Sequence, residues 1–121
     1  MIIGDVFKNI YKGEDFYICL GNFLDEFYKK DNYEKTKMIE GEPEYNISTE
    51  QKAFLASTVH KLANDFQIDV PNWVFKKEYY LKEPYFDCNA KGKLRLLFMY
   101  KSPTEFKHRN VFADENILQR V

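Results

Sequence analysis

Glycine, proline and cysteine are scarce in this chain, with five, four and two copies among 121 residues. Together with a hydrophobic content of 45%, this scarcity excludes collagen-like, low-complexity and mainly disordered chains. No apolar run approaches the roughly 18 residues that a membrane span needs. The chain begins with Met1 and reaches an acid at Asp5, without the basic start of a signal peptide. We therefore expect a soluble, cytoplasmic protein with no membrane partner.

The two cysteines lie far apart, each among apolar or aromatic neighbours. Because no export signal precedes them, buried free thiols are favoured over a disulfide for Cys19 and Cys88. A zinc site made of both cysteines with His60 and His108 would use every Cys and His of the chain. Structural zinc ligands usually come in close pairs, and no such pair exists here, so we expect no metal.

No motif of a known catalytic chemistry is present either. The glycines are scattered, so there is no phosphate-binding loop, and neither H-E-x-x-H nor G-x-S-x-G occurs. We expect that the protein is not an enzyme and has no cofactor. A small enzyme that holds an anionic substrate with Arg95, His108 and Arg109 is the least favoured hypothesis, because it requires a pocket that no spacing demands.

The net charge of −1 is divided unevenly along the chain. Residues 1–60 hold 11 acidic residues and 7 lysines, whereas residues 61–121 hold 8 acidic residues and 11 lysines and arginines. A single folded domain can average these charges into a mixed surface. The alternative is an acidic partner for the C-terminal half.

Apolar residues at helical spacing predict helices over most of the chain. Amphipathic stretches run over residues 3–11, 14–28 and 33–39. Residues 40–46 are acidic and contain glycine and proline, which is typical of a loop. Ser48 and Gln51 then form a capping box at the start of the longest helix.

This helix must end before Pro71, and the amino-acid composition changes after it. Tryptophan, tyrosine and phenylalanine cluster over residues 71–86, and we expect them to fill the core between irregular, proline-containing connections. An exposed aromatic anchor for a partner is the alternative.

Residues 94–100 are apolar almost all round. The length of this run fits a strand or a helix, but a lone strand would lack a partner, so we expect a buried helix. Arg95 either finds partners near the core or lies on an exposed face of this run.

Two further helix starts are expected near the end. Ser102 should cap a helix with Pro103 at its first position and Glu105 closing the box. This helix carries a basic cluster at residues 107–109, which complements the helix dipole, contacts an acidic protein or binds phosphate; the first interpretation is favoured. Asp114 is expected to cap a last helix.

These elements predict an all-α fold, with residues 1–121 forming a single compact orthogonal helical bundle. Residues 1–47 would contain the N-terminal helices and the acidic loop. Residues 48–121 would contain the longest helix and the aromatic region, with irregular connections in the C-terminal half.

The C-terminal half also carries a series of spaced motifs. They are Pro71-x-Trp73-Val74, Tyr80-Leu81-x-Glu83-Pro84-x-Phe86, Lys91-Gly92-x-Leu94-Arg95, Ser102-Pro103-x-x-Phe106-Lys107-x-Arg109-Asn110-Val111-Phe112 and Asn116-x-Leu118-x-Arg120-Val121. This pattern, over residues 54–121, resembles a family of small bacterial proteins that are often encoded beside a nucleotidyltransferase-like toxin gene. The resemblance implies an antitoxin or a regulatory partner, not an enzyme.

Some relatives in that family carry a helix-turn-helix before the corresponding region. The first fifty residues here show no recognition helix with base-reading side chains, so DNA binding of that kind is not expected.

We therefore predict a helical interaction protein that binds and neutralises a protein partner such as a nucleotidyltransferase-like toxin. The predicted partner-binding residues are Trp73, Tyr85, Phe86, Arg95, Lys107, His108, Arg109 and Asn110. The alternative is a nucleic-acid binding regulator, which requires its cations to converge on one face and its binding to weaken steeply with salt. Those cations are Lys76, Lys77, Arg95, Lys107 and Arg109.

Overall fold

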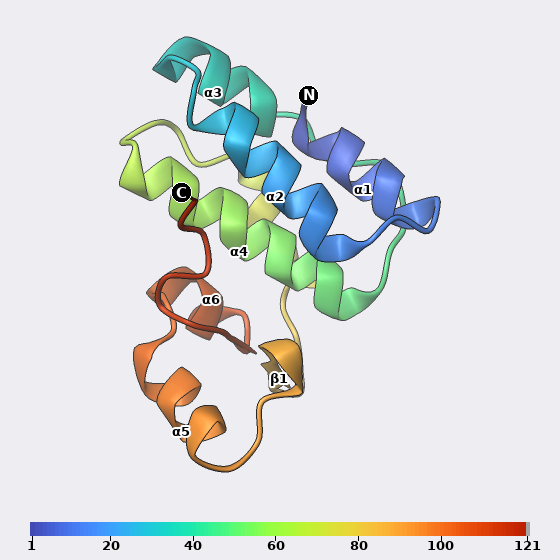
Figure 1. Ribbon diagram of the computed structural model, residues 1–121. Coiled ribbons are helices and arrows are strands. Elements are labelled where there is room, and N and C mark those ends of the chain that lie inside the picture. The colour runs from blue at the N-terminus through green and yellow to red at the C-terminus, as the bar shows by residue number, and fades with distance from the viewer. Residues whose placement is uncertain (121) are drawn as a thin grey trace.

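The computed structural model describes residues 1–120, which form six α-helices and two short strands (Figure 1). The helices are α1 (Ile3–Tyr11), α2 (Phe16–Phe27), α3 (Asn32–Ile39), α4 (Thr49–Asp65), α5 (Gly92–Lys101) and α6 (Thr104–His108). Three 3-10 turns, η1 (Asn72–Phe75), η2 (Lys77–Tyr79) and η3 (Asp87–Asn89), lie between α4 and α5. The prediction of a mostly helical protein is confirmed. Among these residues, no helix has the length and apolar character needed to cross a bilayer.

The strands are β1 (Tyr85–Phe86) and β2 (Val111–Phe112), and they pair in parallel. Tyr85 lies beside Val111, and Phe86 lies beside Phe112. This pair is the one departure from helix and turn in the described chain, and it joins the two ends of the segment that contains α5 and α6.

The N-terminal helices form where the hydrophobic spacing predicts them. Side chains cap three of the helices: Asp15 accepts from the N–H of Ile18 at 3.0 Å, and Asp31 accepts from that of Glu34 at 2.9 Å. Ser48 accepts from the N–H of Gln51 at 3.2 Å, as the capping-box pattern predicts. Such caps satisfy backbone donors that lack a partner within the helix.

Helix α4 is the centre of the fold. Figure 1 shows α1 and α2 on one side of it, and α6 with β1 on the other. The ring of Phe54 packs edge-on against Phe16 at 5.0 Å and against Phe106 at 5.2 Å between ring centroids. The core cluster therefore includes residues from α1 to Leu118.

Trp73 fills the core, as the favoured sequence interpretation predicts. It is buried, and its indole N–H donates to the carbonyl of Ile39 at 3.0 Å. Its ring meets the edges of Phe7 and Tyr79, with centroid distances of 6.4 and 5.1 Å. Because Ile39 ends α3, this bond ties the third helix to η1.

Near the C-terminal end, the helix predicted after Ser102 forms as α6, but the predicted cap and the predicted last helix are wrong. Ser102 does not cap α6: its buried hydroxyl accepts from the N–H of Ala113 at 2.8 Å, and the carbonyl of Pro103 receives the first helical bonds instead. Asp114 starts no helix. Its carboxylate accepts from the N–H of Asn116 at 2.8 Å, which closes a turn.

The segment after this turn packs back on α2. The Tyr28 hydroxyl donates to the carbonyl of Leu118 at 2.8 Å, and Arg120 forms a two-pronged ion pair with Asp25 at 2.8 and 3.1 Å. Gly21 leaves room for it, because a Cβ there would lie 3.0 Å from the Arg120 guanidinium.

We expect Trp73→Phe to lower the free energy of unfolding by about 2–3 kcal/mol, because it leaves the buried carbonyl of Ile39 without its donor and shrinks the side chain. Urea denaturation measures this. The control is Tyr33→Phe on the exposed face of α3, for which a change of less than about 0.5 kcal/mol is expected. Equal effects of the two variants would contradict the role given to the indole bond.

Candidate partner-binding surface

Helix α5 lies on the outside of the protein, at the end of the molecule farthest from α1–α3 (Figure 1). Gly92 has a φ of 58°, a left-handed conformation that glycine adopts without strain, and α5 begins there. Its C-terminal end lies just before Pro103. The prediction of a helix over residues 94–100 is correct, but the prediction of its burial is wrong, because Phe98 alone of these side chains is buried.

The exposed side chains of α5 are large and apolar. Their exposed fractions are 45% for Leu94, 65% for Leu96, 45% for Leu97, 48% for Met99 and 80% for Tyr100. Soluble proteins rarely leave contiguous apolar patches of this kind uncovered, and such patches mark interaction sites. We call these five residues the α5 surface.

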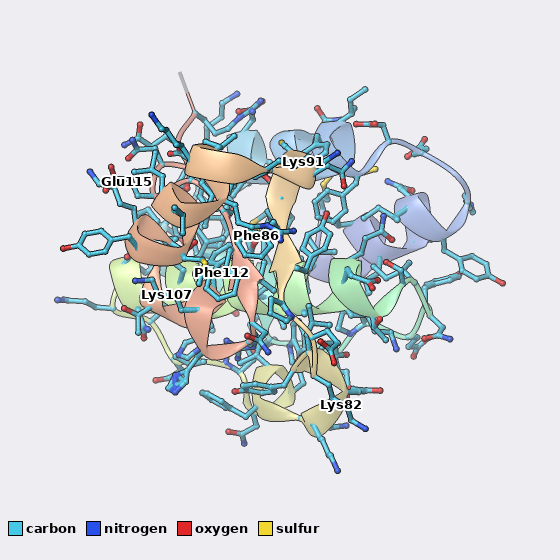
Figure 2. The ribbon with its side chains drawn as sticks, turned by 90° about the horizontal axis from the view of Figure 1, so that it is seen from below. Lys82, Phe86, Lys91, Lys107, Phe112 and Glu115 are labelled. Carbon is cyan, nitrogen blue, oxygen red and sulfur yellow. The ribbon has the colours of Figure 1, made fainter. Side chains whose placement is uncertain are left out.

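Cations border the α5 surface at both ends. They are Lys91, Lys93 and Arg95 at its start, and Lys101 and Lys107 at its end. Figure 2, which views the molecule from the end that carries α5, shows Lys91 and Lys107 on either side of the central Phe86 and Phe112. Five of the eleven cations of residues 61–121 thus lie beside the α5 surface.

Arg95 lies on the exposed face of α5, which settles the two alternatives left by the sequence. Its guanidinium stacks over the ring of Phe86 at 4.1 Å from the centroid, and that ring stacks on Phe112 at 5.1 Å. Beside this stack lies an open cavity of about 240 Å³, to which Asn89 and Lys91 also contribute. Phe86 and Arg95 are therefore predicted site residues that the fold brings together.

Three other predicted site residues are exposed or half-buried. Lys107 is exposed and donates from Nζ to the carbonyl of Tyr100 at 2.7 Å, which holds it at the end of α5. His108 is exposed on α6, one residue further along. Tyr85 is half-buried; it lines the cavity beside Arg95 and also a larger cavity of about 470 Å³ beside Lys77 and Lys82.

Trp73 and Arg109 are corrections to the predicted site, because both are buried and neither presents its side chain to a partner. Arg109 has no exposed surface at all. Its Nη2 donates to the carbonyl of Val74 at 2.8 Å, and its Nη1 donates to the carbonyl of Glu105 at 3.1 Å. Although Glu105 precedes Arg109 by one helical turn, its carboxylate accepts from the amide of Asn64 at 2.9 Å.

Aromatic rings complete the environment of Arg109. The guanidinium lies 4.7 Å from the ring centroid of Tyr80 and 5.9 Å from that of Phe75. Its Nε has no hydrogen-bond partner within the described residues. The cation is therefore held by carbonyl dipoles and ring faces, without a carboxylate, and it fastens α6 to η1.

Asn110, the last predicted site residue, also has an internal role. Its φ of 64° is the left-handed conformation that asparagine tolerates at the end of a helix. Its amide donates to the carbonyl of Leu81 at 3.2 Å. Half-buried there, it connects the end of α6 to the segment before β1.

His60 is half-buried and touches Arg109. The distance from Arg109 Nη1 to His60 Nδ1 is 3.1 Å. Because a guanidinium has only donors, the imidazole nitrogen must accept, which requires neutral histidine. Burial, followed by the charge of Arg109, lowers the pKa of His60, while Glu105 opposes this shift.

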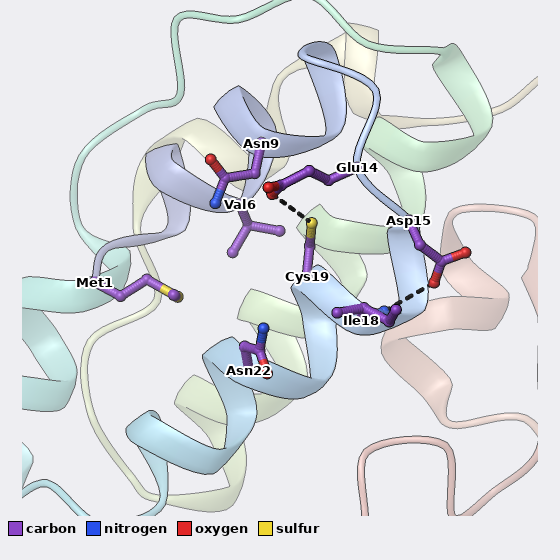
Figure 3. Close-up of a pocket in the computed structure, with 8 residues that line it drawn as sticks. All are labelled: Met1, Val6, Asn9, Glu14, Asp15, Ile18, Cys19 and Asn22. Atoms are coloured by element: carbon purple, nitrogen blue, oxygen red, sulfur yellow. Dashed lines mark hydrogen bonds between the residues drawn. The ribbon is translucent and has the colours of Figure 1, made fainter.

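The thiols of this protein are poor nucleophiles. Cys19 is buried, as predicted, beside a pocket of about 290 Å³ (Figure 3), and it donates to the Glu14 carboxylate at 3.7 Å. Cys88 is free but exposed, contrary to the prediction. Burial raises the pKa of both thiols, and the carboxylates of Glu14 and Asp87 raise it further. Both thiols therefore stay protonated near neutral pH.

A buried carboxylate that the sequence did not single out holds η3 against α2. Asp87 is almost fully buried and accepts a short hydrogen bond from the hydroxyl of Tyr17. Burial and this bond raise the pKa of the Tyr17 hydroxyl above its usual range. Nothing in the sequence around Asp87 signals a partner so distant along the chain.

Neither a metal centre nor the complete cationic face of the nucleic-acid hypothesis forms in residues 1–120. No three His, Cys, Asp or Glu residues there are placed to share a metal ion. Of the five cations named for nucleic acid, Arg109 is buried and Lys76 is paired with Glu42 at 2.6 Å.

The residues that sequence reasoning missed are the apolar ones of the α5 surface. The signal was present: a run assigned to the core holds Arg95 and follows Lys91 and Lys93, and burying such cations without partners is unfavourable.

No family model matches the chain, and neither a curated protein nor a solved structure matches it.

We expect Arg109→Lys to lower the free energy of unfolding by about 2–4 kcal/mol, because an ammonium cannot reach both carbonyls in the fork geometry of a guanidinium. The matched control is Arg95→Lys on the exposed face of α5, for which a loss below about 1 kcal/mol is expected. Chemical denaturation compares the two variants. A smaller loss for Arg109→Lys than for Arg95→Lys would contradict the fastening role of Arg109.

The contact of His60 with Arg109 also predicts a pH dependence of stability. Because folding lowers the pKa of His60, the unfolded chain binds the proton more readily, and stability should fall as the pH drops below about 6.5. Denaturation at several pH values between 7.5 and 5.5 measures this, a window above the titration of the carboxylates. We expect His60→Gln to flatten the decline. A decline that persists in His60→Gln would assign it to other groups.

Proposed function

We propose that the protein is a non-enzymatic interaction protein that binds a protein partner through the α5 surface. The observation that carries this proposal is the exposure of five large apolar side chains on a ten-residue helix with one buried anchor, Phe98. Full burial of such a side chain contributes roughly 1.5–3 kcal/mol, so a partner that covers the surface gains substantial binding energy. A folded chain gains nothing for itself by leaving them in water.

The nature of the partner follows from the motifs of the C-terminal half. Leu94 and Arg95, which belong to one of the motifs that resemble the bacterial family, lie on α5, and Phe86 from another motif lies beneath Arg95. On this basis we propose an antitoxin or regulator whose partner is a nucleotidyltransferase-like toxin. The proposal needs no catalytic group on this chain.

Nucleic-acid binding is the second candidate function. The cations that border the α5 surface favour it, because phosphate contacts by lysine and arginine dominate nucleic-acid affinity. Against it stands the α5 surface itself, in which four of the five side chains are aliphatic, whereas single-stranded nucleic acid stacks its bases on aromatic rings. Leucine and methionine are better suited to a protein groove.

We expect the double variant Leu96→Glu, Tyr100→Ser to abolish or weaken by at least about a hundredfold the complex with the product of the adjacent gene. Two central apolar contacts of this kind each contribute on the order of 2 kcal/mol to binding. Co-expression followed by size-exclusion chromatography and calorimetry measures the loss. Both side chains are exposed, so the fold should be unaffected.

The matched control is Ile18→Glu, Tyr33→Ser, which makes the same kind of change at comparably exposed positions on α2 and α3. It should bind like the unaltered chain. If no complex forms, or if both double variants bind normally, the proposed role of the α5 surface is wrong.

A further inference from the structure

Cations outnumber acids around the α5 surface. No acidic residue occurs between Asp87 and Glu105, and this stretch holds Lys91, Lys93, Arg95 and Lys101. Lys101 lies 3.7 Å from Glu115, and Arg95 stacks on Phe86, while Lys91 and Lys93 form no ion pair within residues 1–120. The apolar face is thus bordered by cations that the rest of the protein leaves largely uncompensated.

The placement of these cations runs against the electrostatics of the helix itself. Lys91, Lys93 and Arg95 lie at the N-terminal end of α5, where the helix dipole favours acidic side chains and disfavours cations. The side chains of this first turn include no acid, and no side chain caps the helix. The cations therefore do not stabilise α5 on its own, and carboxylates from outside the chain would complement them.

A second copy of the chain does not fit this surface. An isologous contact between two α5 helices would bring Lys91 and Lys93 of one copy toward Lys101 of the other, where the neighbouring acid Glu115 can offset only one of these cations. Like charges that face each other across an interface weaken it. The occupant must bring the opposite sign.

We infer that the α5 surface docks into an apolar groove of a partner protein whose edges carry aspartate or glutamate side chains. This inference rests on the proposed function and adds the chemistry of the partner. Leu96, Leu97 and Tyr100 would fill the groove, and the cations at the two ends of α5 would face its acidic edges.

One contact can be placed more closely. The guanidinium of Arg95 lies flat over the ring of Phe86, which orders it, and it forms no ion pair within residues 1–120. Arginine in this arrangement offers a fork of donors to a carboxylate. The cavity of about 240 Å³ beside Lys91, Asn89 and Arg95 has room for one acidic side chain of the partner.

Two synthetic helical peptides of about 18 residues test this inference with the full-length protein. Both carry leucines along one face, and the flanks hold glutamates in one peptide and lysines in the other. Fluorescence anisotropy should show at least about tenfold tighter binding of the glutamate peptide at about 50 mM salt, and a weaker preference at about 500 mM. A thymidine oligonucleotide serves as the third probe.

The variant pair separates local charge from general charge. Lys91→Gln with Arg95→Gln should reduce binding of the glutamate peptide by about tenfold, while Lys12→Gln with Lys29→Gln, at exposed positions in the acidic half, should leave it unchanged. Equal affinity for the two peptides, or binding of neither, would overturn the inference. Tighter binding of the oligonucleotide through Lys91 and Arg95 would overturn it in favour of nucleic acid.

Failure of this inference is distinguishable from failure of the proposed function. If the complex with the adjacent gene product is lost in Leu96→Glu, Tyr100→Ser but is unaffected by Lys91→Gln, Arg95→Gln, the α5 surface binds a protein and only its acidic complement is wrong. If no such complex forms, the proposed function itself fails.

Discussion

The arrangement of the C-terminal half depends on a guanidinium that is fully removed from water without a carboxylate. Arg109 must find its partners among carbonyl oxygens and ring faces, and the two carbonyls it uses belong to Val74 in η1 and Glu105 in α6. Desolvating this cation is tolerable only with those groups in place. The requirement fixes α6 beside α4 and η1, and β2 follows directly after it.

With α6 and β2 fixed in this way, little core surface is left for α5. Phe98 takes the remaining space, and the backbone around Ser102 and Ala113 closes the contact. The other apolar side chains of α5 are therefore exposed to solvent. The exposed surface is thus a consequence of where Arg109, in the buried part of the same segment, finds its hydrogen-bond partners.

The N-terminal helices were predictable because their signals are local: regular apolar spacing, with Asp15, Asp31 and Ser48 at caps. The site was predictable only in part. Phe86, Arg95 and Lys107 belong to the α5 region, but Trp73 and Arg109 are buried. Sequence spacing shows that a residue is apolar or charged, whereas its exposure depends on distant partners such as Ile39 and Val74, which no local pattern indicates.

The parallel pairing of β1 with β2 affects which part of the protein can unfold locally. It joins the ends of the segment that holds α5, so this segment forms a loop whose closure does not rely on α5 itself. Helix α5 is anchored by a single buried side chain, and helices with few buried contacts open with small free energies while the remainder stays folded. Transient fraying of α5 can therefore occur without global unfolding. The binding free energy of a partner that orders the helix must then offset the conformational entropy that the helix loses.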